Sequence, residues 1–242
     1  MKTNHVIEVE NLSKQFGDFI AVNQISFQVK TGEIFGFLGA NGAGKTTAMK
    51  MLIGISSPTS GKAKVAGFDV YKEAESIKKN IGYMSQKFAL YDDLTVKENI
   101  DFFSGIYGLS KQQIETKRNE LIEELELQNV ANHLVASLPL GWKQKLAFSV
   151  SLLHEPKIVF LDEPTGGVDP ITRRQFWEMI YKAAHKGTTI FVTTHYMDEA
   201  EYCNRVSIMV NGKIEALDTP KKLKEQFNAA TMNDVFLKLA RG

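Results

Sequence analysis

Two kinds of apolar pattern recur along the chain, and together they predict a mixed α/β fold. Residues 6–10 and 26–30 alternate apolar and polar side chains, which is typical of strands with one exposed face. Residues 34–38 and 158–161 are instead apolar throughout. Runs of this kind are typical of strands in a parallel sheet that is covered on both faces.

The middle of the chain, from residue 94 to about residue 153, has helical character. Ser110 and Gln113 have the spacing of a capping box, which marks the start of a helix. The apolar residues that follow recur at helical spacing: Ile114, Leu121, Ile122 and Leu125. Because strand patterns lie before and after this block, we expect it to be inserted into one α/β domain.

The α/β alternation resumes after the helical block. The expected elements, in chain order, are a strand (158–161), a helix (172–186), a strand (189–194), a hairpin around Asn211-Gly212 and an amphipathic helical tail from residue 219. Between the last strand and the hairpin, Cys203 falls on the apolar side of a predicted helix with Met197 and Ala200. We therefore interpret this cysteine as a core residue, not as a nucleophile.

Composition narrows the class of protein. Of 242 residues, 43% are hydrophobic and 24% are charged, which is ordinary for a globular protein. Lys plus Arg number 29 against 28 for Asp plus Glu, and this near-balance argues against a chain that binds nucleic-acid backbones. One cysteine excludes a disulfide within the chain. No apolar run approaches the ~18 residues needed to span a bilayer, so we expect any membrane contact to be made through another chain.

A phosphate-binding loop follows the first fully apolar strand. Residues 39–46 match the pattern G-x4-G-K-[ST], with glycines that let backbone N–H groups turn toward phosphate at a helix N-terminus. Lys45 would reach the β- and γ-phosphates, and the Thr46 hydroxyl would ligate Mg²⁺. The binding residues expected in and beside this loop are Gly39, Asn41, Gly42, Ala43, Gly44, Lys45, Thr46 and Thr47.

Four further polar residues lie at the ends of three predicted strands. Asp162 and Glu163 end the apolar run 158–161, so Asp162 is expected to hold the metal and Glu163 to act as general base. Gln86 and His195 follow two other strands. Because ligands collect at the carboxyl ends of parallel strands, we expect Gln86 to contact the metal and the water, and His195 to contact the γ-phosphate.

This order of motifs resembles an ABC-transporter nucleotide-binding domain from about residue 6 to residue 217. Segments 88–99 and 232–236 resemble ABC-2 type drug-exporter ATPases, most of all the second half of their tandem-ATPase members. The resemblance implies a P-loop NTPase core with an N-terminal antiparallel β subdomain and an inserted α-helical subdomain. It also implies ATP and Mg²⁺ as ligands, Phe16 as the aromatic residue that stacks on adenine, and Asp169 in a loop that crosses to a partner subunit.

The resemblance further implies a division of the chain and a set of partners. The ATP-binding core with its β subdomain would occupy residues 1–86 and 155–218, the helical subdomain 87–154 and the tail 219–242. The expected partners are membrane-spanning permease subunits of the ABC-2 type, which dock near residues 86–93, and a second nucleotide-binding domain in a homodimer or heterodimer. No nucleic acid is expected, and the chain would lie at the cytoplasmic face of the membrane.

One motif departs from the family pattern. The signature Leu-Ser-Gly-Gly, followed by Gln, aligns here with Leu138, Pro139, Leu140 and Gly141, followed by Trp142. In the family, the serine hydroxyl and the glycine N–H groups bind the γ-phosphate held by the opposite subunit. Pro139 has neither a hydroxyl nor an N–H group, and Leu140 adds a side chain. We expect the contact to the partner's phosphate to be weakened, although the helix dipole remains.

Two other classes of protein share part of the pattern. A non-transport ABC ATPase acting on ribosomes or chromosomes would carry the same motifs, usually with two cassettes or a coiled coil and a more basic face. A P-loop kinase of small metabolites would explain Lys45 and Asp162 but not Gln86 or His195. Co-purification separates the three classes, because they predict membrane partners, nucleic acid and neither, respectively.

Overall fold

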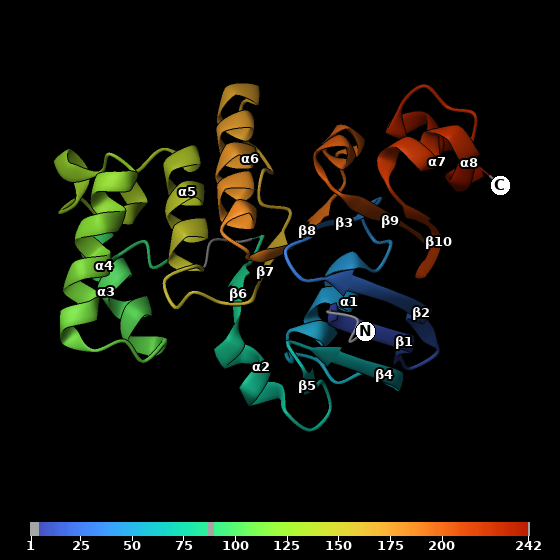
Figure 1. The fold of residues 1–242 in the computed structure, drawn as a ribbon, viewed down its shortest axis with the longest axis horizontal. Helices are drawn as coiled ribbons and strands as arrows, with labels where there is room; N and C mark the ends of the chain where they lie inside the picture. The colour runs from blue at the N-terminus through green and yellow to red at the C-terminus, as the bar shows by residue number, and fades with distance from the viewer. Residues whose placement is uncertain (1–4, 87–89, 242) are drawn as a thin grey trace.

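Two β-sheets form the framework of the chain in a computed structural model that describes residues 5–86 and 90–241 (Figure 1). The larger sheet has the order β10-β9-β3-β8-β7-β6, and the smaller one β2-β1-β4-β5. The larger sheet comprises β3 (Ile34–Gly39), β6 (Ile81–Met84), β7 (Ile158–Asp162), β8 (Thr189–Thr194), β9 (Arg205–Val210) and β10 (Lys213–Asp218). The smaller sheet comprises β1 (His5–Phe16), β2 (Phe19–Lys30), β4 (Ser60–Val65) and β5 (Phe68–Asp69).

Strand direction differs between the two sheets. Strands β9, β3, β8, β7 and β6 are parallel, and only β10 runs against its neighbour in the larger sheet. The smaller sheet is antiparallel. The fully apolar strands lie in the parallel sheet and are buried at every position of β3 and β7, as their sequence pattern predicted.

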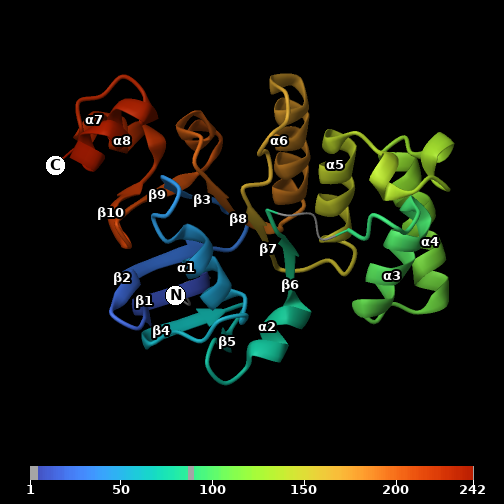
Figure 2. The same ribbon diagram turned by 180° about the vertical axis from the view of Figure 1, so that it is seen from behind.

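Helices cover both faces of the larger sheet and add a block at one end (Figures 1 and 2). Helices α3, α4 and α5 form this block, and α7 and α8 lie at the opposite end with the C-terminus. The helices are α1 (Lys45–Leu52), α2 (Ala74–Asn80), α3 (Val96–Ile106), α4 (Lys111–Glu124), α5 (Leu140–Val150), α6 (Pro170–His185), α7 (Pro220–Gln226) and α8 (Met232–Arg241). The described residues also form three 3₁₀ helices, η1 (Gln128–Val130), η2 (Val135–Ser137) and η3 (Met197–Tyr202). In the described ranges, no helix combines the length and apolar character that crossing a membrane requires.

The larger sheet separates two apolar cores. Phe35 and Phe37 of β3 point into a core shared with α1 and the smaller sheet. Ile34 and Leu38 point into the other core, which contains residues of α5, α6 and the tail. Burial of alternate side chains on opposite faces explains why this strand has no polar position.

Several elements begin or end where local chemistry predicts. Ser110 caps α4 with a capping box, as expected, and a second capping box at Thr95 starts α3. The hairpin at Asn211-Gly212 joins antiparallel strands β9 and β10. Cys203 is buried beside η3, and burial raises the pKa of its thiol, which agrees with its interpretation as a core residue.

Strands β1 and β2 are longer than the sequence pattern predicted. They extend to Phe16 and from Phe19, whereas apolar alternation marked only residues 6–10 and 26–30. The pairing contains register shifts, and Asn11 and Gln24 have positive φ angles of 48° and 50°. Because each shift interrupts the two-residue period, the outer halves of these strands do not alternate.

Candidate functional site

The loop between β3 and α1 leads directly into the first turn of α1. Gly44 precedes α1 with φ of 106°, and a Cβ at this position would lie 2.5 Å from the Ala21 carbonyl oxygen of β2. Only glycine satisfies both conditions, so the loop packs directly against the smaller sheet. The Lys45 ammonium is buried at the start of α1 and donates to the carbonyl oxygens of Gly39 (2.8 Å) and Ala40 (3.1 Å).

Asp162 lies at the carboxyl end of β7, beside this loop. Its Oδ1 accepts hydrogen bonds from Thr193 Oγ1 at 2.6 Å and from Thr46 Oγ1 at 3.3 Å. Thr193 is opposite Asp162 in the register of β7 and β8, which explains the first contact. Burial raises the pKa of the Asp162 carboxyl, while the Thr193 hydrogen bond opposes the shift and the nearby Glu163 charge adds to it.

Glu163 is the centre of a polar cluster at the same edge of the sheet. Its carboxylate lies 3.3 Å from Lys45 Nζ and 2.9 Å from His195 Nδ1, and it accepts a hydrogen bond of 3.1 Å from Gln86 Nε2. Lys45 is the first residue of α1, whereas Gln86 and His195 follow the ends of β6 and β8. The structure thus brings together four residues that are far apart along the chain, Lys45, Gln86, Glu163 and His195.

The backbone of Glu163 is strained. Its φ is 50°, in the left-handed region that residues other than glycine rarely adopt. Its N–H group bonds to the carbonyl oxygen and to Oγ1 of Thr193, both at 3.1 Å. Strain of this kind persists where surrounding contacts over-determine the backbone, and it is common at functional sites.

Phe16 and Asp169 lie outside this cluster. Phe16 ends β1 with 54% of its surface exposed, and the Lys14 ammonium lies 5.0 Å from the centre of its ring. Asp169 caps α6, where its carboxylate accepts from the backbone N–H groups of Ile171 and Thr172. A hydrogen bond from the Thr172 hydroxyl is the main reason why the pKa of Asp169 is lowered.

The variant signature forms the start of α5. Pro139 is the residue before the helix, and Leu140 is its first residue, with 38% of its surface exposed. A Cβ at Gly141 would lie 2.5 Å from Thr172 Cγ2, so this glycine lets α5 approach α6. The remaining glycine of the motif therefore has a packing role at this position.

Four residues that the sequence analysis gave no role also support the site. Thr193 bonds Asp162, Thr165 donates to Glu199, and Gln144 donates to the Gly166 carbonyl oxygen at 3.1 Å. Threonine is common in strands, so Thr193 in β8 gave no indication of a functional role. Gln144 follows the variant signature, so no recognisable motif pointed to it. Glu199 stood in a predicted helix with no motif around it.

The donor set at Thr46 and Asp162 suits a hard cation. Within the described ranges, no group of three or more His, Cys, Asp or Glu residues could hold a metal by itself. However, Mg²⁺ usually takes one or two protein oxygens together with substrate phosphates and water. The Thr46 hydroxyl and the Asp162 carboxylate, which touch each other at 3.3 Å, match that requirement.

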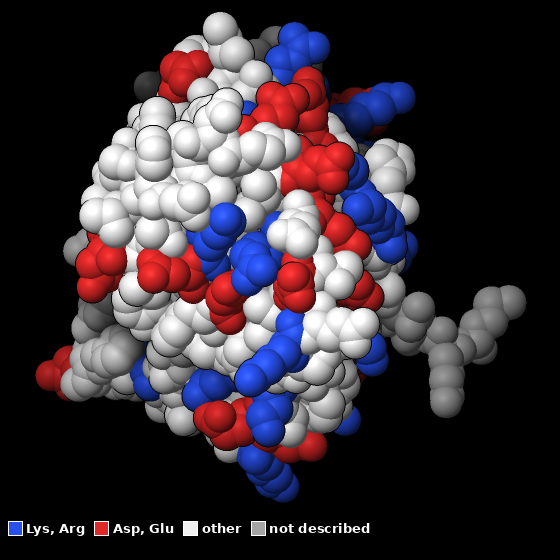
Figure 3. Space-filling model, turned by 90° about the vertical axis from the view of Figure 1, so that its left-hand side faces the viewer, with Lys and Arg blue, Asp and Glu red and all other residues white. Residues whose placement is uncertain are grey.

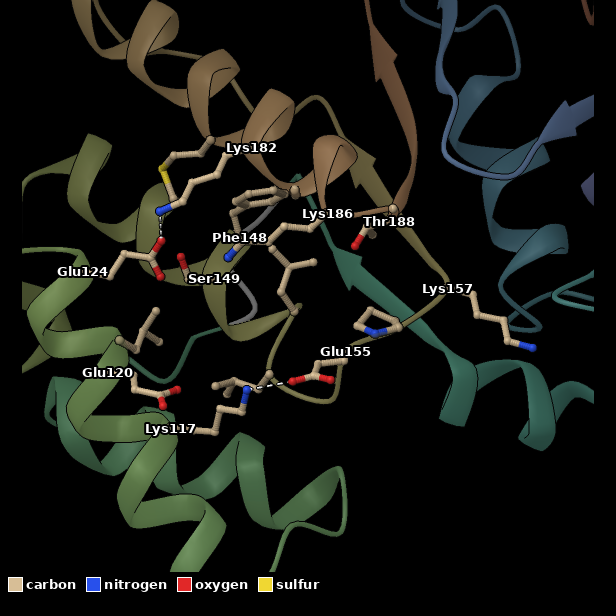
Figure 4. A pocket seen from close by; sticks show the side chains of 17 residues that line it. Lys117, Glu120, Glu124, Phe148, Ser149, Glu155, Lys157, Lys182, Lys186 and Thr188 are labelled. Carbon is tan, nitrogen blue, oxygen red and sulfur yellow. Dashed lines mark hydrogen bonds and ion pairs between the residues drawn. The ribbon is translucent and has the colours of Figure 1, made fainter.

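A groove of about 570 Å³ lies at the amino ends of β7 and β8, opposite to the ends that carry Asp162 and Thr193 (Figure 4). Lys157 and Thr188, which immediately precede β7 and β8, line it together with residues of α4, α5 and α6. Figure 4 shows two ion pairs at this groove, Lys117 with Glu155 and Lys182 with Glu124. Both pairs join α4 to the core of the molecule.

The outer face of the helical block carries charges of both signs. In Figure 3, Lys and Arg alternate with Asp and Glu around an uncharged area. A face that binds nucleic acid would instead gather positive charge. On this face the two signs of charge are interspersed and form no basic patch.

Comparisons with known proteins agree with this geometry. A family model described as ABC transporter matches residues 22–166. The probable multidrug ABC transporter ATP-binding protein YbhF of Escherichia coli is 52% identical over 91% of this chain, but the chain covers only 38% of that protein. The Nod factor export ATP-binding protein I of Burkholderia orbicola is 39% identical over 90% of this chain and 72% of its own length.

A solved structure shows the same fold. It is described as an ATP-binding subunit of an ABC transporter and superposes with a TM-score of 0.87 at 28% identity. The superposition covers 97% of this chain and 99% of the solved one. This agreement confirms the predicted fold class, including the antiparallel sheet and the inserted helices.

Proposed function

The chain belongs to the ABC transporter family, and on that premise we propose that the cluster around Glu163 binds ATP and hydrolyses it to drive membrane partners. The observation that carries the proposal is the convergence of Lys45, Gln86 and His195 on the Glu163 carboxylate. A basic group, an amide and an imidazole beside one carboxylate match the needs of phosphoryl transfer to water.

ATP would bind with its phosphates against the loop 39–46. Backbone N–H groups and the α1 dipole attract the phosphates, and Lys45 adds a positive charge. Phe16 offers an exposed ring for adenine. Thr46 and Asp162 would hold Mg²⁺, with Gln86 close by, and the ion would neutralise phosphate charge.

Hydrolysis would proceed by attack of water on the γ-phosphorus. Glu163 takes a proton from the water as the new oxygen–phosphorus bond forms, and the bond to the ADP oxygen breaks. His195 contacts the γ-phosphate and, through Nδ1, holds the Glu163 carboxylate at 2.9 Å. Gln86 orients the same carboxylate and the attacking water.

Two substitutions separate binding from chemistry. Glu163→Gln should keep ATP binding and lower turnover by roughly 10²–10⁴-fold, because an amide cannot accept the proton. Lys45→Ala should lose binding itself, because it removes a charge aimed at the phosphates of bound ATP. Nucleotide affinity and steady-state ATPase rates measure both effects, and Lys50→Arg, at an exposed position of α1 with no role in the site, is a conservative control. Near wild-type turnover in Glu163→Gln would remove Glu163 from its role.

The partners follow from the family and from the relatives' names. We propose an ABC-2 type exporter, in which permease subunits bind this chain at the cytoplasmic face of the membrane. The expected docking segment, residues 86–93, falls partly outside the described residues, because 87–89 are not described. The boundary between core and helical subdomain at residue 86 falls there too, so the division into subdomains stays a proposal.

We also propose that the chain pairs with a second nucleotide-binding domain whose signature is intact. The chain's own nucleotide-facing residues are complete, whereas Pro139 and Leu140 offer a partner less than the family pattern does. The site on this chain would then be the faster of the two. A transporter subunit explains the motifs better than a ribosome- or chromosome-acting ATPase, since the named relatives are ATP-binding proteins of transporters and exporters.

A further inference from the structure

The loop from residue 163 to residue 169 connects Glu163 to the capping residue of α6, and a buried carboxylate holds its middle. Thr165 Oγ1 donates to Glu199 Oε1 at 2.5 Å. Thr165 is 1% exposed and Glu199 is fully buried. A carboxylate in such a place strongly destabilises the fold unless it is bonded and paired. Its contacts therefore indicate what it holds in place.

Glu199 also reaches α6. Its Oε1 lies 3.7 Å from Arg173 Nε of α6, and Arg173 also pairs with Asp198 at 3.6 Å. The Arg173 guanidinium lies 4.1 Å from the centre of the Tyr196 ring, which in turn lies 4.2 Å from the His195 ring. A continuous chain of contacts thus runs from His195 to the loop without passing through Glu163.

This contact acts on a strained piece of backbone. Glu163 has a φ of 50°, and Gly166 N–H bonds back to the Glu163 carbonyl oxygen at 3.2 Å. Thr165 lies within that turn. The hydrogen bond from its hydroxyl to Glu199 connects the turn to η3. A left-handed glutamate needs such external contacts to keep its conformation.

We infer that Glu199 is a positioning residue, which through Thr165 and Arg173 keeps the Glu163 carboxylate aligned with His195. The inference rests on the proposed function, because it names the support of the same site. If it is correct, loss of the Thr165 hydrogen bond should slow the chemical step while leaving nucleotide binding intact.

The test compares Thr165→Val with Thr165→Ser. Valine keeps the shape and removes the hydroxyl, so we expect kcat to fall on the order of 10-fold, as for a small misplacement of a reacting group. The KM for ATP should change by less than about 2-fold, because the phosphate loop is untouched. Serine restores the hydroxyl and should return kcat to within about 3-fold of wild type.

A second variant and a matched control complete the design. Glu199→Gln keeps the volume and loses the charge that pairs with Arg173, so kcat should fall about 5-fold, since bonds to charged acceptors are roughly twice as strong as neutral ones. Combined with Thr165→Val, it should add little further loss. The control is Glu201→Gln, which changes another acidic residue of η3. Glu201 forms a partly exposed ion pair with Lys224, so its substitution should leave kcat unchanged.

Every outcome decides the inference. A folded Thr165→Val variant with wild-type kcat overturns it, as does a rise in KM that matches the fall in kcat. If Thr165→Val does not fold, Glu199→Gln decides, and wild-type kcat there overturns the inference. Absence of ATP hydrolysis in the wild type, or an active Glu163→Gln variant, would instead refute the proposed function, so the two failures are distinguishable.

Discussion

The two ends of strands β7 and β8 differ in how their polar groups are held. At the carboxyl ends, Asp162 and Thr193 are buried, and their hydrogen bond is 2.6 Å long. At the other ends, Lys117 and Glu155 meet at the rim of the groove with 35% and 77% of their side chains exposed. The same strands therefore connect a tightly bonded site with an open contact.

This difference indicates which contacts would break most easily if the helical block moved. Buried polar groups that lose a partner leave an unsatisfied group behind, so the cluster at the carboxyl ends resists change. Exposed ion pairs contribute little and can be replaced by water. Movement of the helical block relative to the core would therefore break contacts at the groove before it disturbs the cluster around Glu163.

Among the substitutions considered, a change to the variant signature at the start of α5 should have the largest effect. If the chain is made to pair with a second copy of itself, Pro139→Ser with Leu140→Gly would restore one hydroxyl and one close N–H group toward the phosphate bound by the other copy. Each bond to phosphate should return roughly 1.5–3 kcal/mol, or about 10- to 150-fold in affinity. Sedimentation with ATP and turnover measurements would detect tighter dimers or faster hydrolysis.

The single change Leu140→Gly is the control for this pair. Leu140 Cδ2 would lie 3.5 Å from a Cβ at Gly167, so removing it loosens the contact between α5 and the loop before α6 without adding a hydroxyl. If neither dimerisation nor turnover changes in the double variant, the signature departure is not a handicap. The argument for a partner with an intact signature would then fail.

Removal of the buried charge of Asp162 should have a smaller effect, and this effect should be on the stability of the fold. Burial raises the pKa of Asp162 in the folded chain. Its contribution to stability is therefore present below the unfolded pKa and is lost as pH rises through the folded pKa. Asp162→Asn removes the buried charge and should stabilise the nucleotide-free chain at neutral pH. A gain of about 1 kcal/mol would raise Tm by about 2–4 °C.

Asp218→Asn is the matched control for this substitution. The N–H group of Thr219 lowers the pKa of Asp218, so its charge stabilises the fold above the unfolded pKa and its loss should lower Tm at neutral pH. Thermal unfolding from pH 3 to 8, without Mg²⁺ and nucleotide, measures both variants. An Asp162→Asn variant that is less stable at pH 7 would contradict our account of the buried carboxylate.

The groove should show the smallest effect. A double-mutant cycle of Lys117→Met and Glu155→Gln should give a coupling of about 0.2–1 kcal/mol, as for other exposed pairs. The coupling should shrink as salt rises. It should also fall as acid protonates Glu155, whose pKa the Lys117 hydrogen bond lowers. Denaturant unfolding measures the cycle. A coupling above about 2 kcal/mol that ignores salt would erase the contrast between the two ends.

Sequence patterns were sufficient wherever the physical cause is local. Continuous apolar runs identified β3 and β7, the Ser110 capping box marked α4, and Asn211-Gly212 marked a hairpin. The phosphate loop and the strand-end positions identified the family, which the relatives confirmed. The individual roles of Lys45, Gln86, Glu163 and His195 in catalysis remain predictions, although the structure brings these residues together.

Contacts between distant segments could not be predicted from the sequence. Glu199 and Thr165 are 34 positions apart, and neither belongs to a motif that points to the other. The left-handed backbone of Glu163 depends on β8 and on the loop that follows it. The sequence by itself determined the continuously apolar strands, the Ser110 cap and the chemistry available at the strand ends. Only the tertiary structure decided which polar groups meet, because their pairing depends on how the parallel strands and α6 are packed.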